Sequence, residues 1–187
     1  GEVTYDQYNN LAAFKEQVGS DYVPYTTTFT YDSENRPTVL NYGGSRQTTY
    51  TYDGLGRITK RTVSAGNATQ TSNYTYVAGG FGANSTSPLV QTISQPTGNL
   101  SYAYDANGNI TSVSDGSKTV TYAYDKIGQL TRVNDPYDTM AGSVGTTWVY
   151  SYDLGGNIQS KKAYAYTTGT LGSAVKTIPY VYGDANW

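Results

Sequence analysis

The chain has 187 residues, of which 21 are tyrosine, three are phenylalanine and one is methionine. Its 12 basic and 14 acidic residues form no long block of either sign, which argues against nucleic-acid binding and against electrostatic association with membranes. Histidine and cysteine are absent, so the common catalytic triads, thiolate nucleophiles and zinc sites are excluded.

Tyrosine supplies most of the apolar surface. Its ring buries a large area, but its hydroxyl needs water or a hydrogen-bond partner. Tyr, Thr and Val fit a pleated surface and helix formers are scarce, so the composition predicts a sheet with a tyrosine-lined face. No apolar run approaches the length of a membrane span and no signal peptide opens the sequence, so we expect no membrane insertion. Because strand-like residues from Val3 to Asp6 follow Gly1 at once, we expect this chain to be a piece of a longer one.

One motif, Y-x-Y-D-x-x-G-x-[IL]-T, recurs along the chain, most clearly at 102–111 and 122–131. Recurrence of this kind indicates a repeat architecture, and we expect residues 1–187 to form a single array. The repeat starts lie near the tyrosine that precedes the aspartate position of each copy, namely Tyr5, Tyr31, Tyr52, Tyr76, Tyr104, Tyr124, Tyr152 and Tyr182.

The first copy has Asn9 in the glycine position, which is acceptable because asparagine tolerates positive φ. The apolar residues over 11–18 have helical spacing, but the repeat needs a strand there, so we predict a strand with a helix as the alternative. Residues 19–28 are predicted as a connector. Pro37 stands where isoleucine is usual, which indicates an edge, the first residue of a strand or a bulge.

The middle copy is degenerate. Val77 replaces the aspartate, a glycine-rich excursion follows over 78–88, and residues 89–93 are predicted as the returning strand. The last copy is predicted to begin a strand at 180–182.

Within a copy, alternation places Tyr102 and Tyr104 on one face and Ala103 on the other. The aspartate suits the first position of a tight turn, and the glycine three residues later supplies the left-handed conformation. The turn residues that we single out are Asp32, Asp53, Gly56, Asp105, Gly108, Asp125, Gly128 and Asp153. Each copy is therefore strand, turn, strand, and eight copies imply up to sixteen strands. The predicted fold class is all-β, with repetitive antiparallel β-hairpins in a curved or spiralling sheet.

The copies at 52–59 and 104–111 closely resemble the YD repeat of Rhs proteins, which teneurins and insecticidal toxin-complex components share. The resemblance runs from Tyr5 to Tyr182. It implies a β-ribbon that coils into a hollow shell, here a partial YD-repeat shell, around a toxin domain or as an adhesion scaffold. It also implies a secreted or cell-surface bacterial protein whose partners are the rest of its shell and an enclosed toxin domain. The self-cleaving motif D-P-x-G of Rhs shells is not matched at Asp135-Pro136, so we expect no self-cleavage.

Catalysis and metal binding are both disfavoured. The repeated aspartates occupy one slot, where turn closure explains them, so we predict no enzyme activity. Residues 105–109 resemble the opening of a calcium loop, but Ile110 and Gly116 stand where such a loop needs glycine and glutamate. We therefore expect no metal and no cofactor.

A carbohydrate-binding or adhesive module is the main alternative function. Tyr122, Tyr124, Tyr150 and Tyr152 would form a platform on which sugar rings stack. Cross-strand packing of the rings is favoured instead, because tyrosines recur in every copy. We also expect self-association through open sheet edges.

Overall fold

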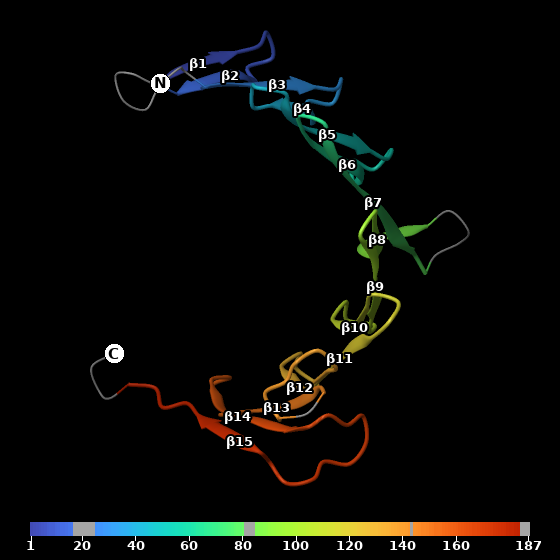
Figure 1. Ribbon diagram of the computed structural model, residues 1–187, viewed down its shortest axis with the longest axis vertical. Helices are drawn as coiled ribbons and strands as arrows, with labels where there is room; N and C mark the ends of the chain where they lie inside the picture. Colours follow the sequence, from blue (N-terminus) through green and yellow to red (C-terminus); the bar gives the residue numbers. More distant parts are fainter. Residues whose placement is uncertain (17–24, 81–84, 143, 184–187) are drawn as a thin grey trace. The chain divides into compact units, whose positions relative to one another are not determined.

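The computed structural model describes residues 1–16, 25–80, 85–142 and 144–183. These residues contain no helix, and they form fifteen strands that Figure 1 labels in chain order. The strands are β1 (Glu2–Tyr5), β2 (Leu11–Glu16), β3 (Tyr25–Tyr31), β4 (Pro37–Asn41), β5 (Arg46–Tyr52), β6 (Ile58–Ala65), β7 (Ala68–Ala78), β8 (Thr86–Gln95), β9 (Gly98–Tyr104), β10 (Ile110–Ser114), β11 (Thr119–Tyr124), β12 (Leu130–Asp135), β13 (Thr146–Tyr152), β14 (Ile158–Ala165) and β15 (Lys176–Pro179).

The strands follow one another in a single sheet, in sequence order from β1 to β15. The sheet is not closed, because β1 and β15 each have a neighbour on one side alone in the described part of the chain. The prediction of an all-β fold built from antiparallel hairpins is therefore confirmed.

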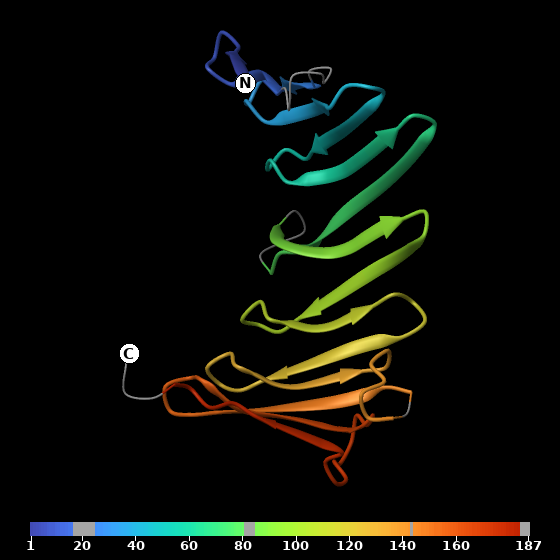
Figure 2. The ribbon, with the colours of Figure 1, turned by 60° about the vertical axis from the view of Figure 1, so that its left-hand side comes forward.

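Contacts divide the chain into two compact units, Gly1–Asn99 and Leu100–Trp187. Within each unit the hairpins lie side by side as a ladder with turns at both ends of the strands (Figure 2). That residues 1–187 form a single array stays a prediction.

A β-bulge marks the end of each regular YD hairpin. In the hairpin of β5 and β6, Thr51 pairs with Lys60 and Tyr52 pairs with Ile58, so Thr59 is left without a partner in the ladder. The Thr59 hydroxyl donates instead to the carbonyl of Thr51 at 3.3 Å. Thr38 and Thr131 make the equivalent contacts in their hairpins, at 3.2 and 3.1 Å. The threonine that ends the motif therefore occupies the bulge and satisfies a backbone carbonyl there.

The two faces of the sheet differ in exposure. In β5, β7, β9, β11 and β13 the two tyrosines of a copy are half-buried, while the small residue between them is exposed. Deeply buried side chains gather in unit Leu100–Trp187, where Trp148 is 6% exposed and Ala163, Thr146 and Thr147 are fully buried.

The structure agrees with two of three local predictions. The strand over 11–18 is confirmed for Leu11–Glu16, while 17–18 lie outside the described residues. Pro37 is the first residue of β4, which is one of the three positions predicted from its missing N–H. The connector over 19–28 is wrong for 25–28, because β3 begins at Tyr25, where the backbone pairs with Glu16 of β2. Residues 19–24 lie outside the described part of the chain.

The predicted strand at 180–182 is also wrong. β15 ends at Pro179, and the N–H of Tyr180 makes a last bond of 3.0 Å to the carbonyl of Gln159. Its partner strand β14 begins at Ile158, so the residues after Tyr180 pass the end of that strand. The described chain accordingly holds fifteen strands where the eight copies allowed sixteen.

Candidate functional site: the contacts between successive repeat units

One aspartate organises each turn. Oδ1 of Asp105 accepts the N–H groups of Asn107 and Asn109, both at 2.9 Å. The N–H of Gly108 donates to the Asp105 carbonyl at 3.1 Å, and Gly108 has a φ of 85°. A single carboxylate oxygen therefore bonds two backbone N–H groups of the turn, and glycine provides the left-handed backbone that closes it.

The same arrangement recurs in five further turns. In each, Oδ1 of the aspartate accepts the N–H groups two and four residues later, and the residue three positions later has positive φ. The pairs are Asp6 with Asn9, Asp32 with Asn35, Asp53 with Gly56, Asp125 with Gly128, and Asp153 with Gly156. All eight turn residues singled out from the sequence lie in these turns.

The fifth residue of a turn bonds the other carboxylate oxygen. The side-chain amides of Asn109 and Asn157 donate to Oδ2 of Asp105 and Asp153, at 2.9 and 3.0 Å. These side-chain bonds, followed by the backbone bonds, hold the pKa of Asp105 and Asp153 below the usual range. Both carboxylates are thus stabilised in their ionised form, which suits a turn and does not suit a general acid.

Arginine takes this fifth position in two turns and reaches the next repeat unit. Nε of Arg57 donates to Oδ2 of Asp53 at 2.8 Å, while its Nη1 donates to Thr86 Oγ1 at 2.8 Å and to the Ser87 carbonyl at 2.5 Å. The guanidinium also lies 4.1 Å from the centre of the Tyr76 ring. Arg57 therefore joins its own turn to the following hairpin by charge, hydrogen bonds and a cation–π contact.

Arg36 repeats this arrangement one unit earlier. Its Nε donates to Oδ2 of Asp32 at 2.7 Å, and its guanidinium lies 4.8 Å from the centre of the Tyr52 ring. The charged residue just after the turn is thus a second contact between units, which the sequence analysis did not single out.

A tyrosine hydroxyl makes the most regular contact between units. The second tyrosine of a copy donates to the backbone carbonyl of the residue in the preceding copy where the strand restarts after its turn. The pairs are Tyr31 with Leu11 at 2.9 Å, Tyr52 with Pro37 at 2.7 Å, Tyr76 with Ile58 at 2.7 Å, Tyr124 with Ile110 at 2.9 Å, and Tyr152 with Leu130 at 2.7 Å. We call this contact the tyrosine strut.

The sequence itself carries a signal for the tyrosine strut. The first aromatic position of a copy is Val3 in one copy and Phe29 in another, whereas the second is tyrosine in all eight. The first position therefore accepts residues without a hydroxyl, whereas the second position keeps the tyrosine hydroxyl in every copy. The recurrence of tyrosine, rather than of any large ring, thus marks the hydrogen bond.

The four tyrosines proposed for carbohydrate binding lie on β11 and β13, with β12 between them. All four are half-buried, and the hydroxyls of Tyr124 and Tyr152 belong to the tyrosine struts. Nζ of Lys161 lies 5.5 Å from the centre of the Tyr150 ring, and burial raises the pKa of the Tyr150 hydroxyl. Their carbohydrate role stays a prediction.

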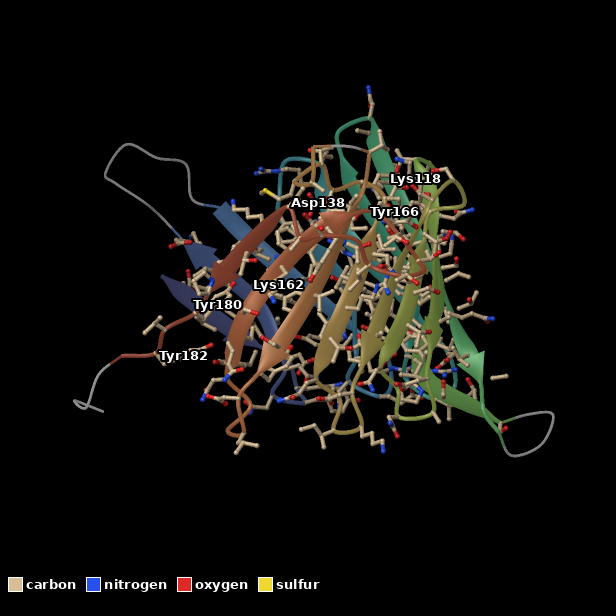
Figure 3. The ribbon with its side chains drawn as sticks, turned by 90° about the horizontal axis from the view of Figure 1, so that it is seen from below. Lys118, Asp138, Lys162, Tyr166, Tyr180 and Tyr182 are labelled. Carbon is tan, nitrogen blue, oxygen red and sulfur yellow. The ribbon has the colours of Figure 1, made fainter. Side chains whose placement is uncertain are left out.

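A cluster around Trp148 in unit Leu100–Trp187 was not predicted. The indole N–H of Trp148 donates to Asp138 Oδ2 at 2.6 Å, and Nζ of Lys161 lies 3.8 Å from the ring centre. The Trp148 bond is the main reason that the pKa of Asp138 is lowered. In Figure 3, Asp138 and Tyr166 lie at the same end of this unit, far from Tyr182. The cluster fastens the loop between β12 and β13 onto the sheet.

The opposite face of the same strands holds a second loop. Oδ1 of Asn134 accepts bonds from Arg132 Nε at 2.8 Å and from the Thr147 hydroxyl at 3.1 Å. Arg132 also donates to the carbonyls of Thr167 and Gly169, the latter at 3.1 Å. The segment after β14 is thus held on the sheet by a buried polar network.

Two absences concern the described residues alone. Within them no group of three or more His, Cys, Asp or Glu side chains is arranged to hold a metal ion. Within the same ranges, no helix has the length and apolarity needed to cross a bilayer.

Part of this chain matches a known protein family. Residues 104–140 match the model of the RHS repeat. A search of curated proteins found no match.

Several solved structures contain a similar chain trace. The matched chain in the crystal structure of TcdB2-TccC3-TEV is 16% identical to this chain, with a TM-score of 0.49. The match covers 86% of this chain and 11% of that one. TcdB2-TccC3 without its hypervariable C-terminal region is 15% identical, with a TM-score of 0.48 and the same coverages of 86% and 11%. The Tc holotoxin pore of Photorhabdus luminescens is 17% identical, with a TM-score of 0.43 and coverages of 75% and 9%.

The present chain therefore spans about a tenth of the solved chains that it matches. Within it, the matched segment contains the turns of Asp105 and Asp125 and the strut from Tyr124 to Ile110. The chain thus carries an RHS repeat at residues 104–140, which confirms there the family recognised from the sequence.

Proposed function

We propose that this chain is a non-enzymatic structural segment of an Rhs-type shell. The observation that carries the proposal is the tyrosine strut, which recurs with the same donor and acceptor positions in five pairs of copies. A contact used identically at each step lets a sheet grow unit by unit, as repeat proteins do. The RHS repeat at residues 104–140 supports the same function.

The mechanism is mechanical. Backbone pairing joins neighbouring strands. The tyrosine strut and the arginine at the fifth position of a turn join neighbouring hairpins close to their turns. Each hairpin offers the carbonyl to which the next tyrosine donates, so the contact holds neighbouring units in one register. The wall that results would enclose or display another part of the protein.

The enclosed component that we propose is a toxin domain, and the remaining wall is the rest of the same shell. Both follow from the family resemblance, as does a secreted or cell-surface location in a bacterium. The test is limited proteolysis with electron microscopy of the longer protein that we expect to contain this chain. A hollow particle that protects an internal domain from protease is the expected result. An extended particle whose domains are all cleaved at similar rates would refute enclosure.

A carbohydrate platform on the tyrosine face is the second proposal. Tyr122 and Tyr150 are half-buried first tyrosines of their copies, so they can be changed without removing a tyrosine strut. Glycan-array binding by the natural chain that disappears in Tyr122→Ala and Tyr150→Ala would support the platform. Absence of binding to all glycans on the array would exclude it.

Self-association through the sheet edges is also proposed. In the described residues β1 and β15 each have one free side, and Val3 and Tyr5 of β1 are 45% and 61% exposed. A free strand edge presents unpaired N–H and C=O groups to another chain. Light scattering should show mass increasing with protein concentration, whereas a monomer at all concentrations would contradict this.

A further inference from the structure

A pocket of about 350 Å³ lies in unit Gly1–Asn99. It is at the strand ends that are farthest from the turns built on the repeated aspartates, which we call the YD turns. Four of its lining side chains belong to four successive strands, β4 to β7. Asn41 pairs with Gln47, Gln47 with Ser64, and Ser64 with Thr69, so these residues form one row across the sheet. Since neighbouring strands are about 4.8 Å apart, the row is roughly 14 Å long.

The row lies on the face opposite the tyrosines. In β5, Thr48 and Tyr50 are on one face of the sheet and Gln47 is on the other. Ser64 pairs with Gln47 and therefore lies on the same face as Gln47. The pocket therefore does not overlap the tyrosine platform or the tyrosine struts.

Two turns close the end of the pocket and hold its shape. The N–H of Gly66 donates to the carbonyl of Ser45 at 3.0 Å, which joins the turn after β6 to the turn after β4. Gly43, Gly44 and Ser45 have φ values of 75°, 57° and 61°, so this turn has three consecutive left-handed residues. The lining is thus set by backbone bonds and does not depend on flexible side chains alone.

The side chains of the row offer both donors and acceptors. Oδ1 of Asn41 accepts the N–H of Gly43 at 2.8 Å, which directs the two N–H donors of this amide elsewhere. The hydroxyls of Ser64 and Thr69 share one hydrogen bond of 3.3 Å, so each keeps further bonding capacity. Gln47 is exposed between them and adds a second carboxamide.

The composition of the lining decides the ligand class. All seven lining residues are Asn, Gln, Ser, Thr, Arg or Gly. An apolar ligand would find no apolar side chain, and a metal cation would find no carboxylate. The carboxamides and hydroxyls of the lining can both donate and accept hydrogen bonds, so they suit a ligand whose hydroxyl groups also do both. The volume is near the lower end of the range of about 300–1,000 Å³ for ligand pockets.

We propose that this pocket binds a short neutral saccharide through Asn41, Gln47, Ser64 and Thr69. The single cationic side chain in the lining, Arg46, does not make the site an anion site, because no second cation lines it. The inference stands apart from the shell function and from the tyrosine platform, since it uses other residues on the other face.

The experiment is a titration of the full chain, followed by heteronuclear NMR of side-chain amides. Cellobiose, maltose and diacetylchitobiose are the neutral probes, and digalacturonic acid is the acidic one. Saturable shifts of the Asn41 and Gln47 amide signals with at least one neutral probe are expected. No shift with any neutral probe at tens of millimolar, or a shift with the acidic probe alone, would overturn the proposal.

A matched pair of variants links the shifts to the row. Gln47→Leu should weaken binding by about 2- to 10-fold, the usual effect of losing a hydrogen bond. Gln70→Leu is the control, because Gln70 is exposed on β7 but pairs with Val63 on the tyrosine face. Equal affinities of the two variants would contradict the site. Thermal melting of both variants shows that a loss of binding does not come from unfolding.

Discussion

The hydroxyl of Tyr124 donates a hydrogen bond of 2.9 Å to the backbone carbonyl of Ile110 in the preceding repeat unit. Backbone pairing between the same two strands, β10 and β11, extends only to Ser112 and Thr121. The side chain therefore joins the hairpins nearer to the YD turns than the backbone does. Each half-buried tyrosine of this kind satisfies its own hydroxyl and a carbonyl at once.

This contact predicts an effect of removing one oxygen atom. Tyr124→Phe should lower the free energy of unfolding by about 0.5–1.5 kcal/mol because it removes the hydrogen bond while keeping the ring. Tyr122→Phe is the control, since Phe29 occupies the equivalent position in another copy. Urea denaturation measures both. Equal losses in the two variants would show that the ring, and not the hydroxyl, joins the units.

The turns predict an order among substitutions at Gly128. A Cβ at this position would meet no atom within 4 Å, so the cost of a side chain comes from its φ of 85°. Gly128→Val should destabilise by about 1–2 kcal/mol, and Gly128→Asn by less, because Asn9 and Asn35 occupy the same turn position. Ala123→Ser, at an exposed strand position, should be nearly neutral. Melting temperatures in that order would support the turn role, and identical values would refute it.

The lowered pKa of Asp105 predicts a pH dependence. The amide of Asn109 and the backbone N–H groups favour the ionised carboxylate in the folded state. Its contribution to stability is therefore fully present above the unfolded pKa of about 3.9 and is lost as the pH falls through the lower folded pKa.

Asp105→Asn tests this dependence. The substitution should lower the urea midpoint at pH 7, and the difference from the natural chain should shrink as the solution is acidified below the unfolded pKa. Glu16→Gln, at an exposed position of β2, serves as the control. A difference that is constant across the pH range would mean that the ionised form of Asp105 has no preferred partners.

The contacts of Arg57 predict that lysine cannot replace arginine at this turn position without a loss of stability. Lysine keeps the charge but cannot bond Asp53, Thr86 and Ser87 together from one planar group. Arg57→Lys should cost about 1–2 kcal/mol of unfolding free energy. Arg61→Lys, at an exposed position of the same strand pair, should be close to neutral. Denaturation midpoints that fall equally would assign the effect of Arg57 to its charge alone.

The sequence by itself determined the hairpin unit and its resemblance to the RHS repeat, whose model matches residues 104–140. The turn aspartate, the left-handed residue three positions later and the alternation of strand faces act within a few residues, so their physical requirements are visible in one copy. The recurrence of copies then predicted antiparallel strands in chain order, and the strand over Leu11–Glu16 followed from the repeat despite its helical spacing.

Only the tertiary structure decided how the units join and which polar groups meet. The strut from Tyr152 to Leu130 links residues 22 positions apart, and Arg57 reaches Ser87 across 30. The row of Asn41, Gln47, Ser64 and Thr69 exists because the registers of four strands agree. These contacts depend on strand register and on the bulge at each hairpin, and a shift of one residue would turn every side chain to the other face.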